Sequence, residues 1–149
     1  MDKQRLGAIA KEFGTPSFVF DEAALGARMR EIKAIVGDSV HLCYSIKANP
    51  FLIPAMQQLV ELLEVCSPGE LEICEDLKVD PRTILFSGVN KTLADVRHAM
   101  DAGVIRFTAE SPLHIRLLEQ AAAARGAIYP VILRLTAGTQ FGKIGRAHV

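Results

Sequence analysis

A lysine follows a short apolar run at a position where it could do covalent chemistry. Residues 42–46 have the length of a buried strand and lead directly into Lys47. Where a buried strand ends, a lysine is partly desolvated, and desolvation disfavours its ammonium form. The neutral amine can attack an aldehyde and form a Schiff base. A solvated charge is the simpler alternative for a single lysine, so this position alone leaves both interpretations open.

An arginine interrupts another apolar run. Arg134 lies within residues 131–135, a predicted strand whose other side chains are all apolar. An arginine is almost never fully buried without a partner. We therefore expect Arg134 to pair with an acidic residue or a ligand, and a purely structural ion pair is the alternative.

The remaining polar residues predict no metal centre. His41, His98 and His114 lack metal-ligand spacing with one another or with acids, so we expect no metal site and no catalytic role for them. Lys91 follows a predicted strand end and could touch a substrate or a phosphate, but a solvated loop lysine is the favoured interpretation.

Short apolar runs alternate with helical patterns along the chain. Capping residues and apolar side chains at helical spacing predict the helices, and glycines such as Gly103 and Gly126 end them. The expected strands are residues 42–46, 63–66, 84–86, 105–108 and 131–135. The expected helices span residues 52–63, begin at Pro68, begin after Thr92, and run from Ser111 to about Arg125.

This alternation predicts an α/β fold with parallel strands and right-handed crossovers. An open doubly wound sheet and a (β/α)8 barrel both fit the pattern. No Gly-x-Gly-x-x-Gly follows any predicted strand, which weakens a dinucleotide-binding interpretation. In a barrel, catalytic residues lie at the carboxyl ends of the strands, which is where the pattern places Lys47.

Another segment precedes these units. Residues before Gly14 form a mixed polar stretch without the long apolar run of a signal peptide. Residues 14–20 predict a turn and a strand. Asp21 then caps a predicted helix with one apolar face, formed by Leu25, Met29, Ile32 and Val36.

Composition narrows the class of protein and its partners. The chain has 149 residues, of which 50% are hydrophobic and 23% charged, as in a globular domain. Lys and Arg number 17, as do Asp and Glu, so the zero net charge predicts no affinity for nucleic acid or an acidic membrane. No apolar run could span a bilayer. Three cysteines without Cys-x-x-Cys spacing favour reduced thiols in a cytoplasm.

Five segments together resemble the fold-type III enzymes, which use pyridoxal phosphate. That family includes alanine racemase and the diaminopimelate, ornithine and arginine decarboxylases. The segments are residues 13–21, 44–50, 64–71, 86–92, and 133–135 with 140–142. Each is weak alone, but their order and spacing are specific. The resemblance extends from about Phe13 to Lys143 and implies a partial (β/α)8 TIM-type barrel with about five of its eight strands.

The resemblance implies a role for individual residues. Lys47 would be the catalytic residue, holding pyridoxal phosphate as a Schiff base and later acting on the substrate carbon. Glu64 matches an acidic position near the cofactor lysine, and Arg134 would bind the ring hydroxyl side or an acid such as Glu64. Glu70 matches an acidic position of the second-strand segment, although the N3 residue of a capping box explains it at least as well.

The same resemblance implies a reaction. Asn49 is followed by Pro50, as in the decarboxylases, whereas alanine racemases usually continue Asn-Ala-Tyr-Gly. The implied function is an amino-acid decarboxylase, most like diaminopimelate decarboxylase, which releases the α-carboxylate as CO2. A racemase of the same barrel and a non-catalytic pyridoxal-binding homologue are alternatives. Diaminopimelate decarboxylases typically carry a longer loop than residues 136–139, which leaves another diamino acid or a carrier-bound amino acid open as substrate.

Parts of the implied enzyme are expected outside this sequence. The phosphate loop, the carboxylate that meets the pyridine nitrogen and a C-terminal β domain would lie downstream, and a second subunit would complete the site in a homodimer. We interpret residues 1–143 as the front portion of the barrel domain. Residues 144–149 are a suspected non-native tail, with a divergent loop as the alternative. Such a piece would be inactive alone and poorly soluble, because its fifth strand is an exposed edge.

Overall fold

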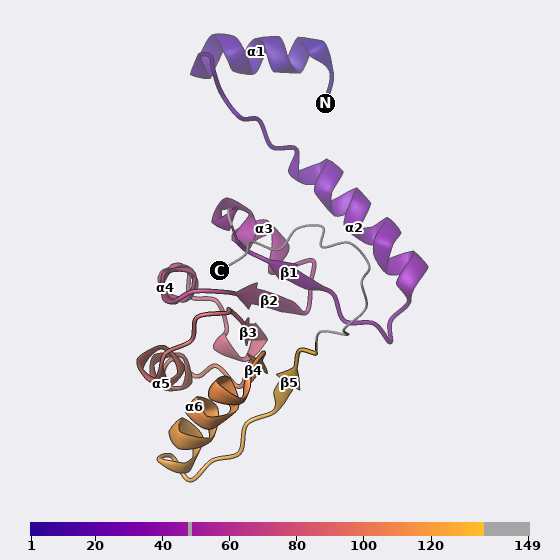
Figure 1. Ribbon diagram of the computed structural model, residues 1–149. Helices are drawn as coiled ribbons and strands as arrows, with labels where there is room; N and C mark the ends of the chain where they lie inside the picture. The colour runs from indigo at the N-terminus through magenta and orange to yellow at the C-terminus, as the bar shows by residue number, and fades with distance from the viewer. Residues whose placement is uncertain (48, 136–149) are drawn as a thin grey trace, which may run out of the picture.

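A five-stranded parallel sheet forms the centre of the computed structural model, which describes residues 1–47 and 49–135 (Figure 1). The strands are β1 (Cys43–Ser45), β2 (Leu62–Val65), β3 (Ile84–Phe86), β4 (Arg106–Ala109) and β5 (Val131–Leu133). All five predicted strands are therefore confirmed, with ends that differ from the prediction by up to two residues. Each strand pairs in parallel with the next one along the chain.

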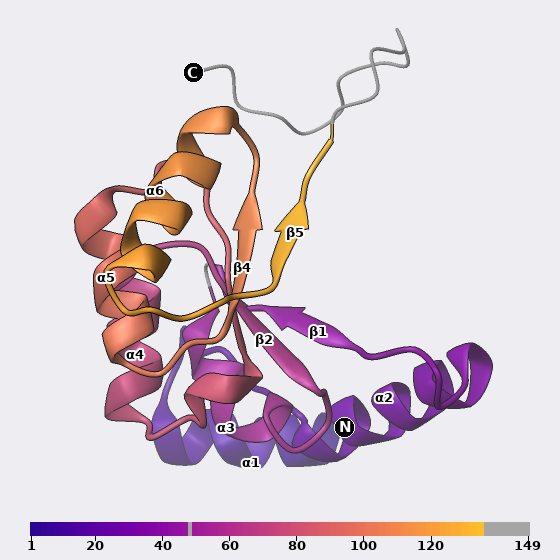
Figure 2. The ribbon, with the colours of Figure 1, turned by 90° about the horizontal axis from the view of Figure 1, so that it is seen from below.

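The strand order decides between the two architectures that the sequence allowed. A doubly wound sheet reverses its strand order at a switch point, but here the order runs β1-β2-β3-β4-β5 without reversal. In Figure 2, α4, α5 and α6 all lie on one side of the sheet. One-sided helices with sequential parallel strands are the arrangement of a barrel. The partial barrel is thus confirmed.

The helices begin at the capping residues that the sequence predicts. Ser67 and Ser111 cap α4 and α6, each with a proline in the first turn, and Thr92 forms a capping box with Asp95 at the start of α5. The helices are α1 (Lys3–Phe13), α2 (Glu22–Val36), α3 (Ile53–Met56), α4 (Pro68–Asp76), α5 (Leu93–Asp101) and α6 (Pro112–Ala123). Two 3₁₀ turns, η1 (Pro50–Leu52) and η2 (Pro81–Thr83), precede α3 and β3. None of the described helices could cross a membrane.

The predicted helix over residues 52–63 is wrong in its extent. The helical part ends at Met56, where the backbone N–H groups of Leu59 and Val60 both bond to the Met56 carbonyl and turn the chain back. The turn is required because β2 must start at Leu62 to pair with β1. Apolar side chains at helical spacing thus continued past the end of the helix.

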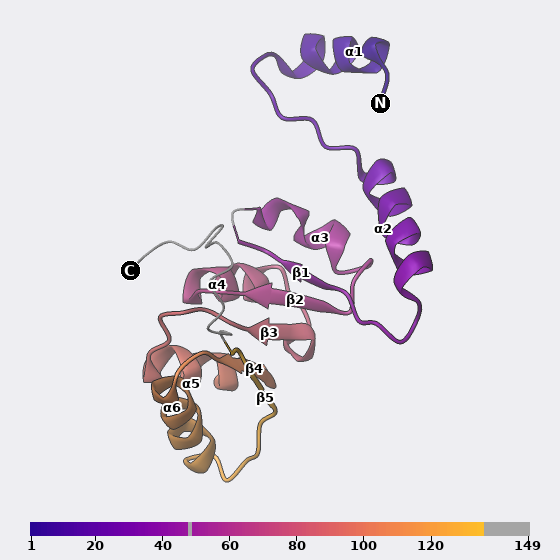
Figure 3. The same cartoon turned by 45° about the vertical axis from the view of Figure 1, so that its right-hand side comes forward.

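Two N-terminal predictions also differ from the structure. Residues 17–20 follow the predicted turn but form no strand, since no described strand lies beside them to take up their backbone hydrogen bonds. α1 was not predicted, although Asp2 caps it by accepting a bond from Arg5 N. It buries none of its residues and lies away from the sheet in Figures 1 and 3.

The hydrophobic core lies between the sheet and helices α4 to α6. Alternate strand residues such as Val65, Phe86 and Phe107 point into it and are almost fully buried. Phe107 packs edge-to-face against Phe86 and Tyr129, with ring centroids 6.1 and 5.7 Å apart. The other alternate residues must therefore face the opposite side of the sheet, where the helices do not reach.

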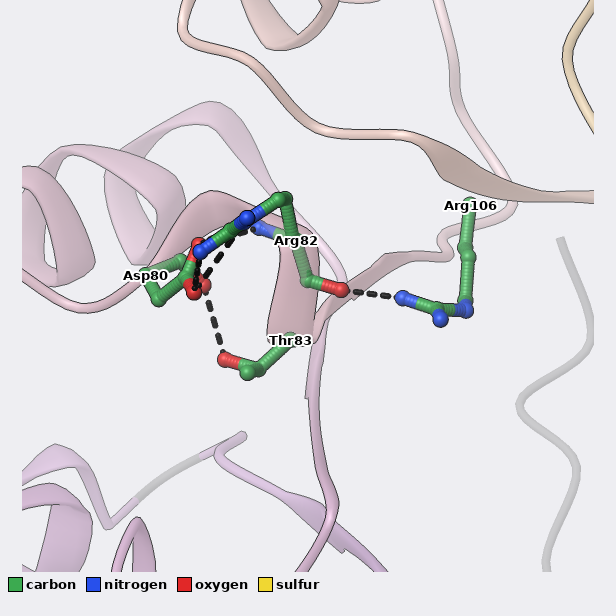
Figure 4. A network of polar contacts seen from close by, with 4 residues as sticks. All are labelled: Asp80, Arg82, Thr83 and Arg106. Carbon is green, nitrogen blue, oxygen red and sulfur yellow. Dashed lines mark hydrogen bonds and ion pairs between the residues drawn. The ribbon is translucent and has the colours of Figure 1, made fainter.

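The amino ends of the strands carry a structural polar network (Figure 4). Asp80 accepts bonds from the backbone and side chain of Arg82, and Thr83 Oγ1 donates to Asp80 O at 2.7 Å. Arg106, the first residue of β4, donates to Arg82 O. These contacts tie β4 to the start of β3 at the end of the sheet remote from Lys47.

Candidate active site

Polar side chains gather on the sheet face that the helices leave open. Because side chains alternate along a strand, burial of Leu63 and Val65 against the helices turns Glu64 and Cys66 to the other face. The register places Ser45 beside Glu64, and the Lys47 amine reaches Cys66 Sγ on the same face. Several functional groups of adjacent strands thereby meet at the carboxyl end of the sheet.

A strained turn presents Lys47 at the end of β1. Its φ of 40° lies in the left-handed region, which side chains other than glycine rarely adopt. Asn49 N donates to Ile46 O at 2.9 Å, and Tyr44 Oη donates to Asn49 O at 2.9 Å, so the turn is held from both sides. Such strain costs about 1–3 kcal/mol and accumulates at functional sites.

The Lys47 amine is open to a ligand. The side chain is exposed, which corrects the expected desolvation, since five strands cover this face incompletely. Nζ donates to Cys66 Sγ at 3.6 Å and makes no ion pair with any described residue. A primary amine that no carboxylate holds is suited to bond an aldehyde, so this position fits pyridoxal.

Glu64 lies on the neighbouring strand at the matching level. Its Oε2 accepts a bond from Ser45 Oγ at 2.5 Å, and the residue is half-buried, so it is more than a fully solvated rim carboxylate. Burial, followed by the Glu64 charge, raises the pKa of the nearby Cys43 thiol to about 11. In the described part of the chain, no three His, Cys, Asp or Glu side chains gather as metal ligands would.

Glu70 stabilises the start of α4. Its backbone N–H donates to Ser67 Oγ at 3.2 Å, as in a capping box, but its carboxylate accepts from Cys66 N at 2.7 Å and not from Ser67 N. The carboxylate therefore holds the backbone of the residue that contacts the Lys47 amine. Ser67 therefore caps α4 as predicted, but Glu70 does not complete the reciprocal half of the capping box.

The loop after β3 closes over the loop after β2. Gly88 has a φ of 125°, and a Cβ at this position would lie 2.4 Å from Cys66 O, so only glycine fits. Three residues later, Lys91 turns inward and is 5% exposed. Its Nζ donates to Gly88 O at 2.5 Å and to Thr108 Oγ1 at 3.3 Å. The expectation of a solvated loop lysine was wrong.

Glu110 and His114 extend the polar row past β4. Glu110 N donates to His114 Nδ1 at 3.3 Å, so that nitrogen carries no proton in this arrangement. Burial lowers the pKa of His114, and the positive charge of Lys91 acts in the same direction. Arg134 donates to Glu110 Oε1 at 3.4 Å. Its acidic partner is thus Glu110 and not Glu64, because β3 and β4 separate Arg134 from β2.

The sequence identified part of this arrangement. Lys47 and Glu64 lie on paired strands, whereas Arg134 follows β5 at the other edge of the sheet. Sequence analysis did not single out Cys66, and it undervalued Lys91. Alternation with a period of two could have revealed Cys66, since it lies two residues after Glu64. Nothing local marks Lys91, whose burial depends on Thr108 in the next unit.

A family model and curated relatives match most of the chain. The model described as pyridoxal-dependent decarboxylase, pyridoxal binding domain, matches residues 22–145. The diaminopimelate decarboxylase of Pseudomonas aeruginosa is 36% identical over 133 residues, which cover 87% of this chain and 32% of that protein. The diaminopimelate decarboxylase of Mycobacterium leprae is 34% identical over 140 residues, covering 91% and 29%. This chain therefore spans about a third of these relatives.

Solved structures share the fold. The lysine/ornithine decarboxylase of Vibrio vulnificus, complexed with cadaverine, superposes with a TM-score of 0.76 at 19% identity and covers 93% of this chain and 37% of that one. The diaminopimelate decarboxylase of Helicobacter pylori, complexed with L-lysine, gives a TM-score of 0.66 at 21% identity, covering 84% and 33%. At these identities the likeness supports the fold.

Proposed function

Because this chain belongs to the pyridoxal-dependent decarboxylases and matches their pyridoxal-binding domain, we propose that Lys47 holds pyridoxal phosphate covalently. The whole protein would then release the α-carboxylate of an amino acid as CO2. The observation that carries this proposal is the Lys47 amine after the carboxyl end of β1, held in a left-handed turn, bonded to Cys66 Sγ and paired with no carboxylate of the described residues. The chain spans 32% of its Pseudomonas relative, so the complete reaction belongs to a longer protein.

The residues of this chain would bind, orient and transfer a proton. Bound pyridoxal supplies an electron sink for the pair that the departing carboxylate leaves. The Lys47 amine is the covalent anchor, and once displaced by the substrate amine it is placed to move a proton at the reacting carbon. Glu64 keeps Oε2 on Ser45, which leaves Oε1 to bind the cofactor. Arg134 would approach it from β5, with Glu110 fixing its guanidinium.

The substrate that these similarities favour is a diamino acid. The curated relatives reported above decarboxylate diaminopimelate, as their names state, and we extend that substrate class to this chain as a proposal. The loop that bears on diaminopimelate specificity, residues 136–139, lies outside the described residues, as do residues 140–149 and the proposed boundary after residue 143.

A homodimer and a cytoplasmic location complete the proposal. The family resemblance implies that a second subunit completes the site of the full-length protein. Cys43, Cys66 and Cys74 form no disulfide with one another, which suits a reducing compartment. Equal numbers of acidic and basic residues give no general affinity for nucleic acid.

The anchor can be tested directly on the chain. Pyridoxal phosphate is added, the absorption of a lysine-bound pyridoxal is recorded, and borohydride reduction followed by peptide mass mapping locates the modified lysine. We expect the label on Lys47, with the band lost in Lys47→Ala and kept in Lys11→Ala, an exposed control on α1. A label spread over surface lysines, or a band that survives Lys47→Ala, contradicts the cofactor assignment.

The reaction needs the full-length protein. CO2 release is measured with diaminopimelate, lysine, ornithine and arginine, again with Lys47→Ala as control. Release of CO2 from one of these amino acids that is lost in Lys47→Ala supports the decarboxylase and identifies its substrate. If the Lys47-dependent absorption band forms but no amino acid releases CO2, a racemase or a pyridoxal-binding protein replaces the decarboxylase as the proposed function.

A further inference from the structure

Lys91 is a buried cation whose direct contacts are uncharged. Within the described residues its ammonium bonds to Gly88 O at 2.5 Å and Thr108 Oγ1 at 3.3 Å, and it forms no ion pair. Burying an ammonium without a contacting carboxylate is costly, and a neutral donor would carry no such cost. The charge itself therefore calls for an explanation.

Ionisable groups of several segments act on this charge. Glu64 lies in β2, Cys66 follows β2, and Glu110 follows β4. α6 contributes His114, whose pKa is lowered first by burial and second by the charge of Lys91. Burial lowers the pKa of Lys91 itself, and the Coulomb interactions with Glu110, Cys66 and Glu64 act in the opposite direction.

The two contacts of Lys91 also fix the backbone of the site. Gly88 O belongs to the loop that packs on Cys66, and Thr108 lies in β4 next to the segment that leads to Glu110. The Lys91 charge is thus held in a fixed position.

We propose that Lys91 is a positioning residue of the pyridoxal site. Its ammonium ties the loop after β3 to β4, and that loop packs on Cys66, the residue that contacts the Lys47 amine. The same ammonium places a fixed positive charge behind this loop. This inference deepens the proposed function, because it assigns a residue that fixes the backbone and the charge near Lys47. Lys91 acts through Cys66 and the loop at Gly88 and needs no contact with the substrate.

The first test requires no pyridoxal. The rate at which an alkylating reagent labels Cys66 is followed against pH, with peptide mapping to separate Cys66 from Cys43 and Cys74. Removing a fixed positive charge favours the protonated form of each neighbouring group. We expect Lys91→Met and Lys91→Gln to move the midpoint up by roughly half to one pH unit, and Lys91→Arg to leave it near that of the parent chain.

Control variants separate charge from folding. Lys91→Gln removes the charge but keeps a neutral N–H donor on a side chain one bond shorter, and Lys91→Met removes both the charge and the donor. Lys33→Met breaks an ion pair between α2 and Glu61, remote from the site, and should lower stability without moving the Cys66 midpoint. Lys47→Met should raise it, because the Lys47 ammonium contacts Cys66 Sγ.

The second test uses the pyridoxal-loaded protein. The pH midpoint of the Lys47–pyridoxal absorption should rise in Lys91→Gln and return in Lys91→Arg. Midpoints that stay unchanged in Lys91→Met and Lys91→Gln while stability falls would overturn the proposal and leave Lys91 a structural tether. Absence of any Lys47-dependent band in the parent chain would refute the proposed function alone, since the Cys66 titration still decides the role of Lys91.

Discussion

Two lysines in the described residues have a positive φ, and they differ in what explains it. Lys78, at 54°, follows the C-cap of α4, where Val79 N bonds to Cys74 O, so a helix end accounts for its conformation. Lys47, at 40°, follows a strand and has no helix end to explain it. Strain at the residue with the free amine is what a functional position predicts.

Substituting Gly88 tests how tightly the two loops of the site fit together. Gly88→Ala adds a Cβ at 2.4 Å from Cys66 O and forces alanine to a φ of 125°. We expect a loss of about 2–4 kcal/mol in the free energy of unfolding, measured by urea denaturation. Gly69→Ala in α4, where nothing lies within 4 Å, is the control and should be neutral or slightly stabilising. Equal effects of both substitutions would contradict the close packing.

At the residue scale, the sequence predicted the site residues that are marked by a local pattern, and it did not predict contacts between distant segments. Lys47 and Glu64 were identifiable because strand ends can be recognised from apolar runs. The pairing of Arg134 with Glu110 was not, since it depends on which strands are neighbours. The burial of Lys91 likewise requires Thr108, which comes from the following unit of the chain.

At the scale of elements, one ion pair fastens α2 to the sheet. Lys33 Nζ donates to Glu61 Oε1 at 2.5 Å and to Val40 O at 2.9 Å, while Glu61 Oε2 accepts from Leu42 N at 2.7 Å. α2 buries no residue fully, although Leu25 and Met29 pack against the core. The ion pair between Lys33 and Glu61, with its hydrogen bonds, is therefore a substantial part of what holds α2 against the sheet.

This fastening should depend on pH. The Lys33 hydrogen bond, with that of the Leu42 backbone, lowers the pKa of Glu61 from 4.5 to about 2. A lowered folded-state pKa stabilises above the unfolded value, and the contribution is lost as the pH falls from 4.5 toward about 2. We expect the melting temperature of Glu61→Gln to fall less than that of the parent chain as the pH is lowered through this window. Glu31→Gln, on an exposed pair with Arg28, should leave it unchanged.

Elements were predictable where caps and turns agree with the apolar pattern, as for α4, α5 and α6. The extent of α3 was not, because the pairing of β2 with β1 ends the helix early. Residues 17–20 have strand-forming side chains, but a strand needs a neighbour, and no described strand provides one. The local pattern therefore indicates which secondary structure a segment prefers, and the pairing of strands determines whether the segment adopts it.

For the whole molecule, β5 is one of the two edge strands of the described sheet. No described strand pairs with it on the side away from β4, and Ile132 is 53% exposed. Next to it, an apolar groove of about 680 Å³ lies between α6 and β5, lined by residues that include Leu118, Tyr129 and Leu133. An apolar edge of this kind promotes association between chains.

Self-association of the chain should follow from that edge. In sedimentation velocity over a concentration series, we expect the average mass to rise with concentration. Ile132→Lys places a charge on the exposed strand and should reduce the rise, whereas Ile35→Lys, at an exposed position of α2 outside the groove, should change it little. A monomer at every concentration would show that the edge is protected.

The sequential order of the sheet also bears on how the chain folds as it is synthesised. Each strand pairs with the one made just before it, so no strand waits for a distant partner. Paired residues of neighbouring strands are 19 to 24 residues apart, from Cys43 with Leu62 to Phe107 with Val131, and the entropy of loop closure grows only slowly with length. The site, by contrast, needs Lys47 from the first strand and Thr108 from the fourth. A nascent chain should thus acquire the cofactor lysine early and its buried companion Lys91 only after β4 has emerged.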